Sequence, residues 1–202
     1  SSGVPGLFMP KGARAGELIA LALIALSALA GISGAGLAFA RGDAQPDELS
    51  LAWRLPELLA GAGAVTGGAA ARIRVDALSA LFLIPILLVS AVGALYGLGY
   101  WPERDHPENG RKLRFFYGLT AAGLALVVVA GDSVTFLFAW ELMALSAYFL
   151  VTAESQHEAA RSAGWIYLVA THTASLCLFA AFALLMSKSG SFSLTPLGPG
   201  IA

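Results

Sequence analysis

The chain has 202 residues and a formal net charge of −1; 57% of its residues are hydrophobic, 12% are charged, and the mean hydropathy is +0.75. Soluble domains carry about 25% charged residues, so this composition excludes an ordinary soluble domain and indicates a membrane protein. The small net charge gives no reason to expect nucleic acid as a partner. The single cysteine, Cys177, excludes an intrachain disulfide and any metal-ligand spacing of cysteines.

Five apolar segments follow one another along the chain. They cover about residues 18–40, 77–99, 115–130, 133–153 and 163–187. Each is long enough to cross about 30 Å of hydrocarbon as a helix, the third only just. Their apolar residues lie on all sides rather than alternating, which favours helices over barrel strands. We therefore predict an all-α polytopic membrane protein with about five transmembrane helices, in a single membrane domain over 1–202.

The first segment has an alternative interpretation. Basic residues precede it and Ala38-Phe39-Ala40 resembles a cleavage site, as in a secretory signal. Its apolar run exceeds the 7–15 residues of a signal core, so we expect a retained helix. Residues 41–75 form an extramembrane loop in which Arg72-Ile73-Arg74-Val75 alternates and predicts a short strand at 72–75. With Ser1 inside, seven Lys and Arg lie inside and five outside, which favours that orientation.

Glu141 lies in the middle of the fourth apolar segment. An ionisable side chain at the centre of a membrane helix costs about 2.5–3.5 kcal/mol on insertion scales for Asp, Lys or Arg, and such residues mark partners or ion pathways. Burial favours the protonated form of a carboxyl group and a nearby cation favours the ionised form. A carboxyl group in which these two effects balance exchanges a proton near neutral pH. We therefore predict proton transfer at Glu141. The alternative is that Glu141 makes a static hydrogen bond or ion pair between helices.

Two more residues are predicted to take part in proton transfer. His172 lies in the fifth segment at a depth similar to that of Glu141, a pattern expected of a proton relay. Its alternative role, with Thr171 and Thr173, is hydrogen bonding between helices. Tyr148 lies on the face of Glu141 and could bridge it to the cytoplasmic side through water, or be an interfacial tyrosine. Asp132 and Asp76 stand at helix starts, where they are helix caps or channel residues.

The stretch around Glu141 resembles the antiporter-like proton-translocating subunits of complex I (NADH:quinone oxidoreductase), of hydrogenase-4 and formate hydrogenlyase (component B type), and of Mrp cation/proton antiporters. The resemblance rests on DSVTFLFAWELMALSAYFLV at 132–151, RVDALSALF at 74–82, AGWIYLVATH at 163–172 and YGLGYW at 96–101. It covers about residues 72–190. The Trp-Glu pair between an Asp and a Tyr is its most specific part.

The resemblance implies that the chain is part of a larger antiporter-like helical bundle. The subunit would be built from two inverted repeats, each a half-channel, with Glu141 as the intramembrane carboxylate of the first. In the family this glutamate pairs with a lysine on a broken helix, two helices later. Lys188, at the end of the fifth segment, is not that lysine. The chain begins with Ser1 and ends on Pro199-Gly200-Ile201-Ala202, and we therefore expect an N-terminal fragment holding part of one half-channel.

Three functions remain open at this point. The first is a proton-translocating subunit of a redox complex in the bacterial cytoplasmic membrane, with other membrane subunits as partners and a proton, or else sodium, as the ion. The chain would then hold no cofactor and no redox active site of its own, since it offers no cluster-binding cysteines and no flavin or nicotinamide fingerprint. The second is an Mrp-type cation/proton antiporter without a redox partner. The third is a structural scaffold.

Overall fold

The structure is a computed structural model that describes residues 3–4, 14–41, 47–51 and 71–194. It contains five long helices and a two-stranded sheet. These are α2 (Arg14–Arg41), β1 (Asp47–Leu51), β2 (Ala71–Val75), α4 (Ala77–Tyr100), α5 (Gly110–Val129), α6 (Ser133–Val151) and α7 (Glu158–Ser189). All five helices are long and apolar enough to span a membrane, so the predicted fold class, an all-α membrane protein with five spanning helices, is confirmed.

Three helices begin earlier than their apolar segments. α2 begins at Arg14 rather than near Leu18, α5 at Gly110 rather than Phe115, and α7 at Glu158 rather than Ala163. The added turns carry charged residues, because a helix continues past the hydrocarbon into the headgroup region, where long basic side chains reach water. Of the extramembrane loop 41–75, residues 42–46 and 52–70 lie outside the described part of the chain.

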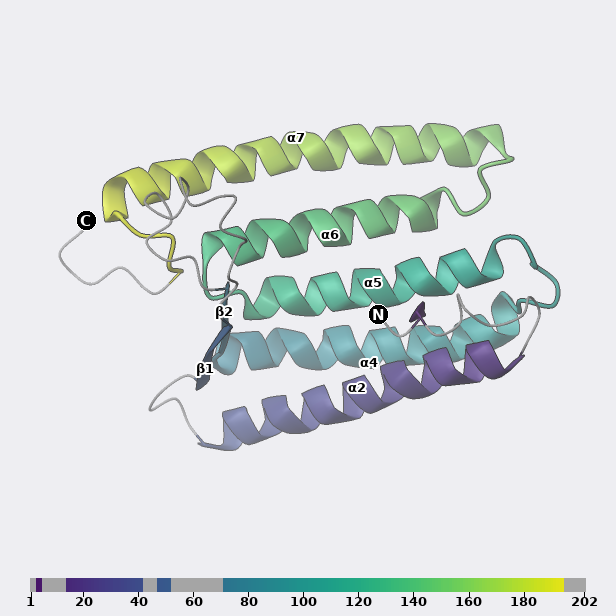
Figure 1. The fold of residues 1–202 in the computed structure, drawn as a ribbon, viewed down its shortest axis with the longest axis horizontal. Coiled ribbons are helices and arrows are strands. Elements are labelled where there is room, and N and C mark those ends of the chain that lie inside the picture. The colour runs from purple at the N-terminus through teal and green to yellow at the C-terminus, as the bar shows by residue number, and fades with distance from the viewer. Residues whose placement is uncertain (1–2, 5–13, 42–46, 52–70, 195–202) are drawn as a thin grey trace.

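The helices stand side by side in one row, in the order α2, α4, α5, α6, α7 (Figure 1). The row is held together mainly by small side chains. The buried hydrophobic residues of the described chain are Ala20, Ile24, Ala28, Ala35, Ala80, Ala139 and Ala144. Such small residues let membrane helices approach closely. At Gly123 of α5 a Cβ would lie 3.0 Å from the backbone Met143 Cα of α6, so this approach of the two helices requires glycine.

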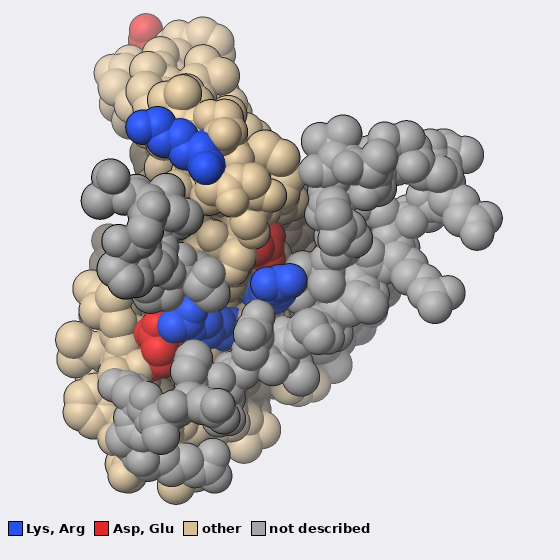
Figure 2. Space-filling model, turned by 90° about the vertical axis from the view of Figure 1, so that its left-hand side faces the viewer, with Lys and Arg blue, Asp and Glu red and all other residues tan. Residues whose placement is uncertain are grey.

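The strand predicted at 72–75 lies within β2, which pairs antiparallel with β1 so that Asp47 is opposite Val75 and Leu51 opposite Ala71. β2 also holds the turn between α5 and α6. Gly131 N donates to Arg72 O at 2.7 Å, and Leu194 N donates to Gly131 O at 3.0 Å. The turn is thus fixed between β2 and the segment after α7, because its backbone groups need partners. Seen from this end, basic and acidic side chains lie side by side (Figure 2).

Two aspartates cap helices at the strand end. Asp132 Oδ1 accepts from Thr135 N at 2.8 Å, and its Oδ2 accepts from the Thr135 hydroxyl at 2.6 Å and from Arg72 N at 2.9 Å. Asp76 Oδ1 accepts from Ser79 N at 2.8 Å. Both therefore satisfy N–H groups of a first helical turn that have no partner within the helix. Asp132, 7% exposed, also joins α6 to β2.

The opposite end is held by a buried charge network. Glu17 at the start of α2 and Glu103 in the α4–α5 loop are 8% and 3% exposed, and the Arg114 guanidinium bonds to both. The Arg114 Nη1 to Glu17 Oε1 distance is 3.0 Å, and Arg111 Nε lies 3.7 Å from Glu103 Oε1. Glu103 N donates to Glu17 Oε1 at 2.7 Å. The network connects α2, the loop and α5.

Replacing Arg114 by Gln should therefore destabilise the protein. Two buried carboxylates would lose their shared cation, and breaking a buried ion pair in this way costs about 3–5 kcal/mol. Thermal unfolding in detergent, followed by size exclusion, measures the effect. The control is Arg104→Gln, because Arg104 is exposed and pairs only with the exposed Asp105. Equal midpoints for the two variants would show that the network does not support the fold.

Asp76 contributes to the stability of the folded protein in a way that depends on pH. Burial raises the pKa of Asp76, but hydrogen bonds from the Ser79 N–H and hydroxyl, together with the Arg74 guanidinium, outweigh it and leave the pKa below 3.8. Because the folded pKa lies below the unfolded one, this stabilisation is present above the unfolded value and is lost as the pH falls through the folded value.

We therefore expect Asp76→Ala to lower the free energy of unfolding by about 1 kcal/mol at neutral pH, as for other N-caps. The penalty should stay constant above about pH 5 and shrink as the pH falls from there through the lowered folded pKa, while Asp76→Asn should keep most of the cap. Thermal midpoints across this pH range test the prediction, with Asp105→Ala as an exposed control. A penalty that does not change with pH would mean that the carboxylate charge contributes nothing.

Candidate functional site

Glu141 lies near the middle of a membrane helix. It is the ninth of the nineteen residues of α6, about 12 Å along the axis from Ser133 and about 15 Å from Val151. The side chain is half-buried, and within the described part of the chain it has no hydrogen bond and no ion pair. A carboxyl group at this depth is expensive without a partner, so its surroundings decide what it can do.

The side of α6 that packs on α5 does not include Glu141. That contact is made by Ser146, which accepts a hydrogen bond of 2.9 Å from the Thr120 hydroxyl, and by Phe149, whose ring stacks on Phe116 at 4.3 Å. Helical spacing places Glu141 instead with Val134, Phe138 and Leu145, which are 46%, 54% and 42% exposed. Glu141 therefore borders an exposed apolar face.

Two contacts fix the register between α6 and α7. A Cβ on Gly164 would lie against Tyr148 and Thr152, and the Phe136 and Phe182 rings meet edge to face at 5.4 Å. Because the two helices are antiparallel, interpolation between these contacts places Glu141 level with about Ser175. Ser175 is 4% exposed and follows Gly164 and Thr171 at helical spacing, on the side of α7 that faces α6.

Three polar groups at this level have no partner among the described residues. They are the Glu141 carboxyl group, the Ser175 Oγ and the indole Nε1 of Trp140, the last two fully buried. Buried polar atoms are nearly always hydrogen-bonded, to protein or to ordered water. An unpaired hydroxyl and an unpaired indole N–H at the level of an unpaired carboxyl group therefore mark this level of the bundle as the candidate site.

Neither Ser175 nor a polar role for the Trp140 indole, which also packs within the bundle, was identified from the sequence. The packing role is present, since Trp140 stacks on Phe136 at 6.2 Å between ring centroids. The signal for Ser175 was its spacing from Gly164 and Thr171, which marks one polar stripe on an otherwise apolar helix. Its level relative to Glu141 required the packing of α6 on α7.

His172 lies three residues from Ser175, about 4.5 Å along α7. It is exposed, and no bond joins it to Glu141 within the described residues. Its Nδ1 lies 3.0 Å from Leu168 O. A carbonyl oxygen only accepts, so Nδ1 carries the proton in this contact and Nε2 is the nitrogen that can take one up. The proton-transfer role of His172 stays a prediction.

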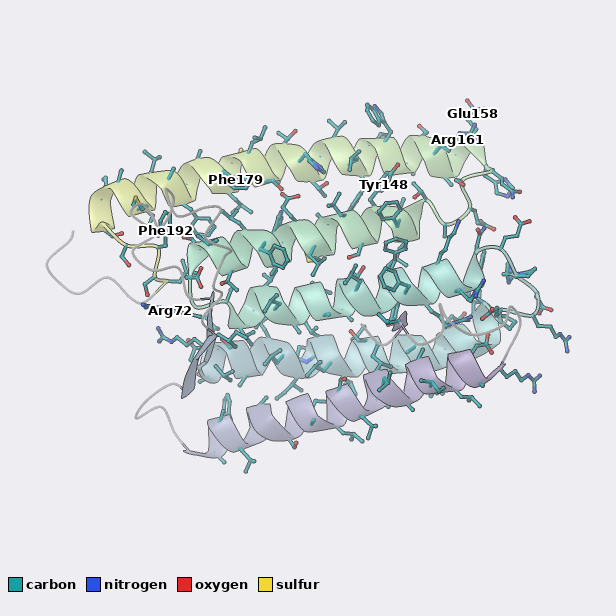
Figure 3. The ribbon with its side chains drawn as sticks, viewed as in Figure 1. Arg72, Tyr148, Glu158, Arg161, Phe179 and Phe192 are labelled. Atoms are coloured by element: carbon teal, nitrogen blue, oxygen red, sulfur yellow. The ribbon has the colours of Figure 1, made fainter. Side chains whose placement is uncertain are left out.

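Tyr148 lies seven residues from Glu141, about 10 Å along α6. It is half-buried between α6 and α7, close to Gly164 (Figure 3). It also lines a pocket of about 390 Å³ between the start of α5, the end of α6 and the start of α7. The Tyr148 ring thus lies between this pocket and the level of Glu141. The proton-transfer role of Tyr148 stays a prediction.

Asp76 and Asp132 lie far along the bundle from Tyr148, at the strand end. Both oxygens of Asp132 accept hydrogen bonds that hold the fold. The geometry of both aspartates is that of helix caps.

The C-terminal part of the chain, residues 130–200, matches the family model described as NADH:quinone oxidoreductase/Mrp antiporter, TM. Hydrogenase-4 component B of Escherichia coli (strain K12) is 32% identical over 135 residues, which cover 64% of this chain and 20% of that protein. The chain spans about a fifth of the length of the curated relatives it matches.

Two solved structures share the fold. The chain matches a subunit of the membrane-bound sulfane sulfur reductase, an archaeal respiratory membrane complex, with a TM-score of 0.66 and 18% identity over 95% of this chain and 27% of that chain. It matches a subunit of the Mrp complex from Dietzia sp. DQ12-45-1b with a TM-score of 0.64 and 25% identity, over 87% of this chain and 17% of that chain. Together with the motif around Glu141 and the row of five membrane helices, these matches show that the chain is an integral membrane protein similar, over part of their length, to subunits of NADH:quinone oxidoreductase, hydrogenase-4 and Mrp complexes.

Proposed function

We propose that the chain carries part of a proton half-channel in a proton-translocating subunit of a membrane-bound redox complex. The observation that carries this proposal is the carboxyl group of Glu141, which lies mid-membrane without a partner among the described residues, level with the unpaired Ser175 hydroxyl and Trp140 indole. A proton relay needs a group that can hold a proton at this depth and polar neighbours that can hold water beside it.

The proposed path begins at the pocket lined by Tyr148. Protons enter there from the water, pass the phenol group and reach Glu141 through water held by Ser175 and Trp140. Nε2 of His172 is the next acceptor along α7. A change of charge at Glu141 acts on neighbouring titratable groups through the low-dielectric interior, where Coulomb interactions are strong, and this coupling passes the transport step to adjacent subunits.

The redox complex is proposed from the relatives. The 32% identical relative is a component of hydrogenase-4, and the sulfane sulfur reductase is a respiratory membrane complex. We place the chain in a hydrogenase-4/formate hydrogenlyase or complex I-like assembly of the bacterial cytoplasmic membrane, with cofactors and electron transfer in other subunits. The alternative is an Mrp-type cation/proton antiporter, and the match to the Dietzia Mrp complex favours it. The identity of the neighbouring genes would distinguish a redox complex from an Mrp-type antiporter.

Glu141→Gln, made in the full reading frame that contains this chain, should abolish proton flux. The amide keeps the size of the side chain but holds no exchangeable charge. Flux into proteoliposomes containing the assembled complex, read with a pH-sensitive dye, measures the loss. Glu154→Gln, on the exposed α6–α7 loop, removes the same charge outside the membrane and should leave the flux unchanged. Wild-type flux in Glu141→Gln would leave only the scaffold function.

Ser175→Ala should lower the flux several-fold without lowering stability. The change removes the unpaired hydroxyl that we assign to water binding, and removing a buried group without a partner is neutral or stabilising. Ser187→Ala, at an exposed site of the same helix, is the matched control. A drop in thermal stability of Ser175→Ala with unchanged flux would show instead that the hydroxyl is a structural group.

A further inference from the structure

The pocket at the Tyr148 end has a positively charged lining. Ten residues line its volume of about 390 Å³. Two of them, Lys112 of α5 and Arg161 of α7, are basic, and none is acidic. Nearby Glu154 and Glu158 are exposed and lie outside the lining. The lining comes from the end of α6 and the starts of α5 and α7, where the candidate spans end. Tyr148 and Arg161 lie together at this end of the bundle (Figure 3).

Both basic side chains have donors to offer. Lys112 is exposed and makes no hydrogen bond or ion pair within the described residues. Arg161 Nη1 donates to Ser155 O at 2.9 Å and to Gln156 O at 3.1 Å, which fixes the guanidinium on the loop and leaves its Nε and Nη2 to bind elsewhere. Asn109 also lines the pocket and makes no cap bond to the first turn of α5. The positive end of the α5 dipole therefore adds to the two cations.

The other side of the pocket is apolar. Leu113, Phe116 and Phe149 line it, and the Phe116 and Phe149 rings stack at 4.3 Å. Phe149 is 46% exposed, on the same side of α6 as the exposed Leu145. The pocket thus joins cations at the headgroup level to an apolar surface that descends along the membrane helix, which is the polarity of a phospholipid.

We infer that this pocket binds the phosphate group of an anionic phospholipid. Lys112 and Arg161 donate to the phosphate oxygens, and one acyl chain lies along Phe149 and Leu145. Guanidinium and ammonium groups bind phosphate through charge-assisted hydrogen bonds, and basic pockets between membrane helices bind anionic headgroups. Free inorganic phosphate shares the headgroup chemistry but not the acyl contact. The inference rests on the membrane location of the chain and not on proton transfer at Glu141.

The test uses the assembled complex in detergent and three probes: phosphatidylglycerol, phosphatidylcholine and inorganic phosphate. Phosphatidylglycerol should raise the thermal midpoint in a concentration-dependent way, since a ligand of the folded state stabilises it. The neutral phosphatidylcholine and inorganic phosphate should raise it less. Native mass spectrometry should show retained phosphatidylglycerol. An equal rise with inorganic phosphate would show an anion site and overturn the lipid assignment.

Lys112→Gln should weaken phosphatidylglycerol binding about tenfold, the change expected for one lost charge-assisted contact. The fold should survive, because Lys112 holds no other residue in the described structure. Lys188→Gln removes the same charge from an exposed site at the other end of the bundle and is the matched control. Unchanged binding in Lys112→Gln, or an equal loss in Lys188→Gln, would overturn the inference. Proton flux is not read in this experiment, so its outcome is independent of the proposed function.

Discussion

A charge in the middle of a membrane has to be compensated, and this constraint organises the structure around α6. Within the described residues no cation lies against Glu141, and α5 occupies the other side of the helix. What surrounds the carboxyl group is the α7 interface, with two buried donors that lack partners, and an exposed apolar face. Water beside the unpaired donors, or a further helix against the exposed face, would each lower the cost of the charge.

The single row of helices explains why so much apolar surface is exposed. The main helix contacts are between neighbours in the row, and alanine, glycine and serine contribute many of the buried positions. The broad faces carry exposed residues such as Leu26, Val89 and Leu176. In a membrane these faces meet lipid or other helices without the penalty that water would impose. Close packing along the row then sets the register in which polar residues of α6 and α7 face each other.

The two ends of the row are built differently, and the difference follows their tasks. At the strand end, backbone hydrogen bonds to β2 and Asp132 fix the short turn between α5 and α6 and so the position of α6. At the other end, Arg114 joins two carboxylates and ties α2 to α5, while Lys112 and Arg161 remain available beside an open pocket. Both ends therefore hold helices in place, the first through backbone hydrogen bonds and the second through buried charges, and the second end also carries the pocket with its two basic side chains.

The sequence by itself determined the five membrane helices, the caps at Asp76 and Asp132, and the depth of Glu141, because length, hydropathy and 1.5 Å of rise per residue are local properties. It could not determine where α5 and α7 begin, because charged turns extend each helix before the start of its apolar run. Nor could it pair Arg114 with Glu17, 97 residues away, or place Ser175 level with Glu141. Those relations depend on which helices are neighbours and in which register they pack, and only contacts such as Gly164 against Tyr148 decide that register.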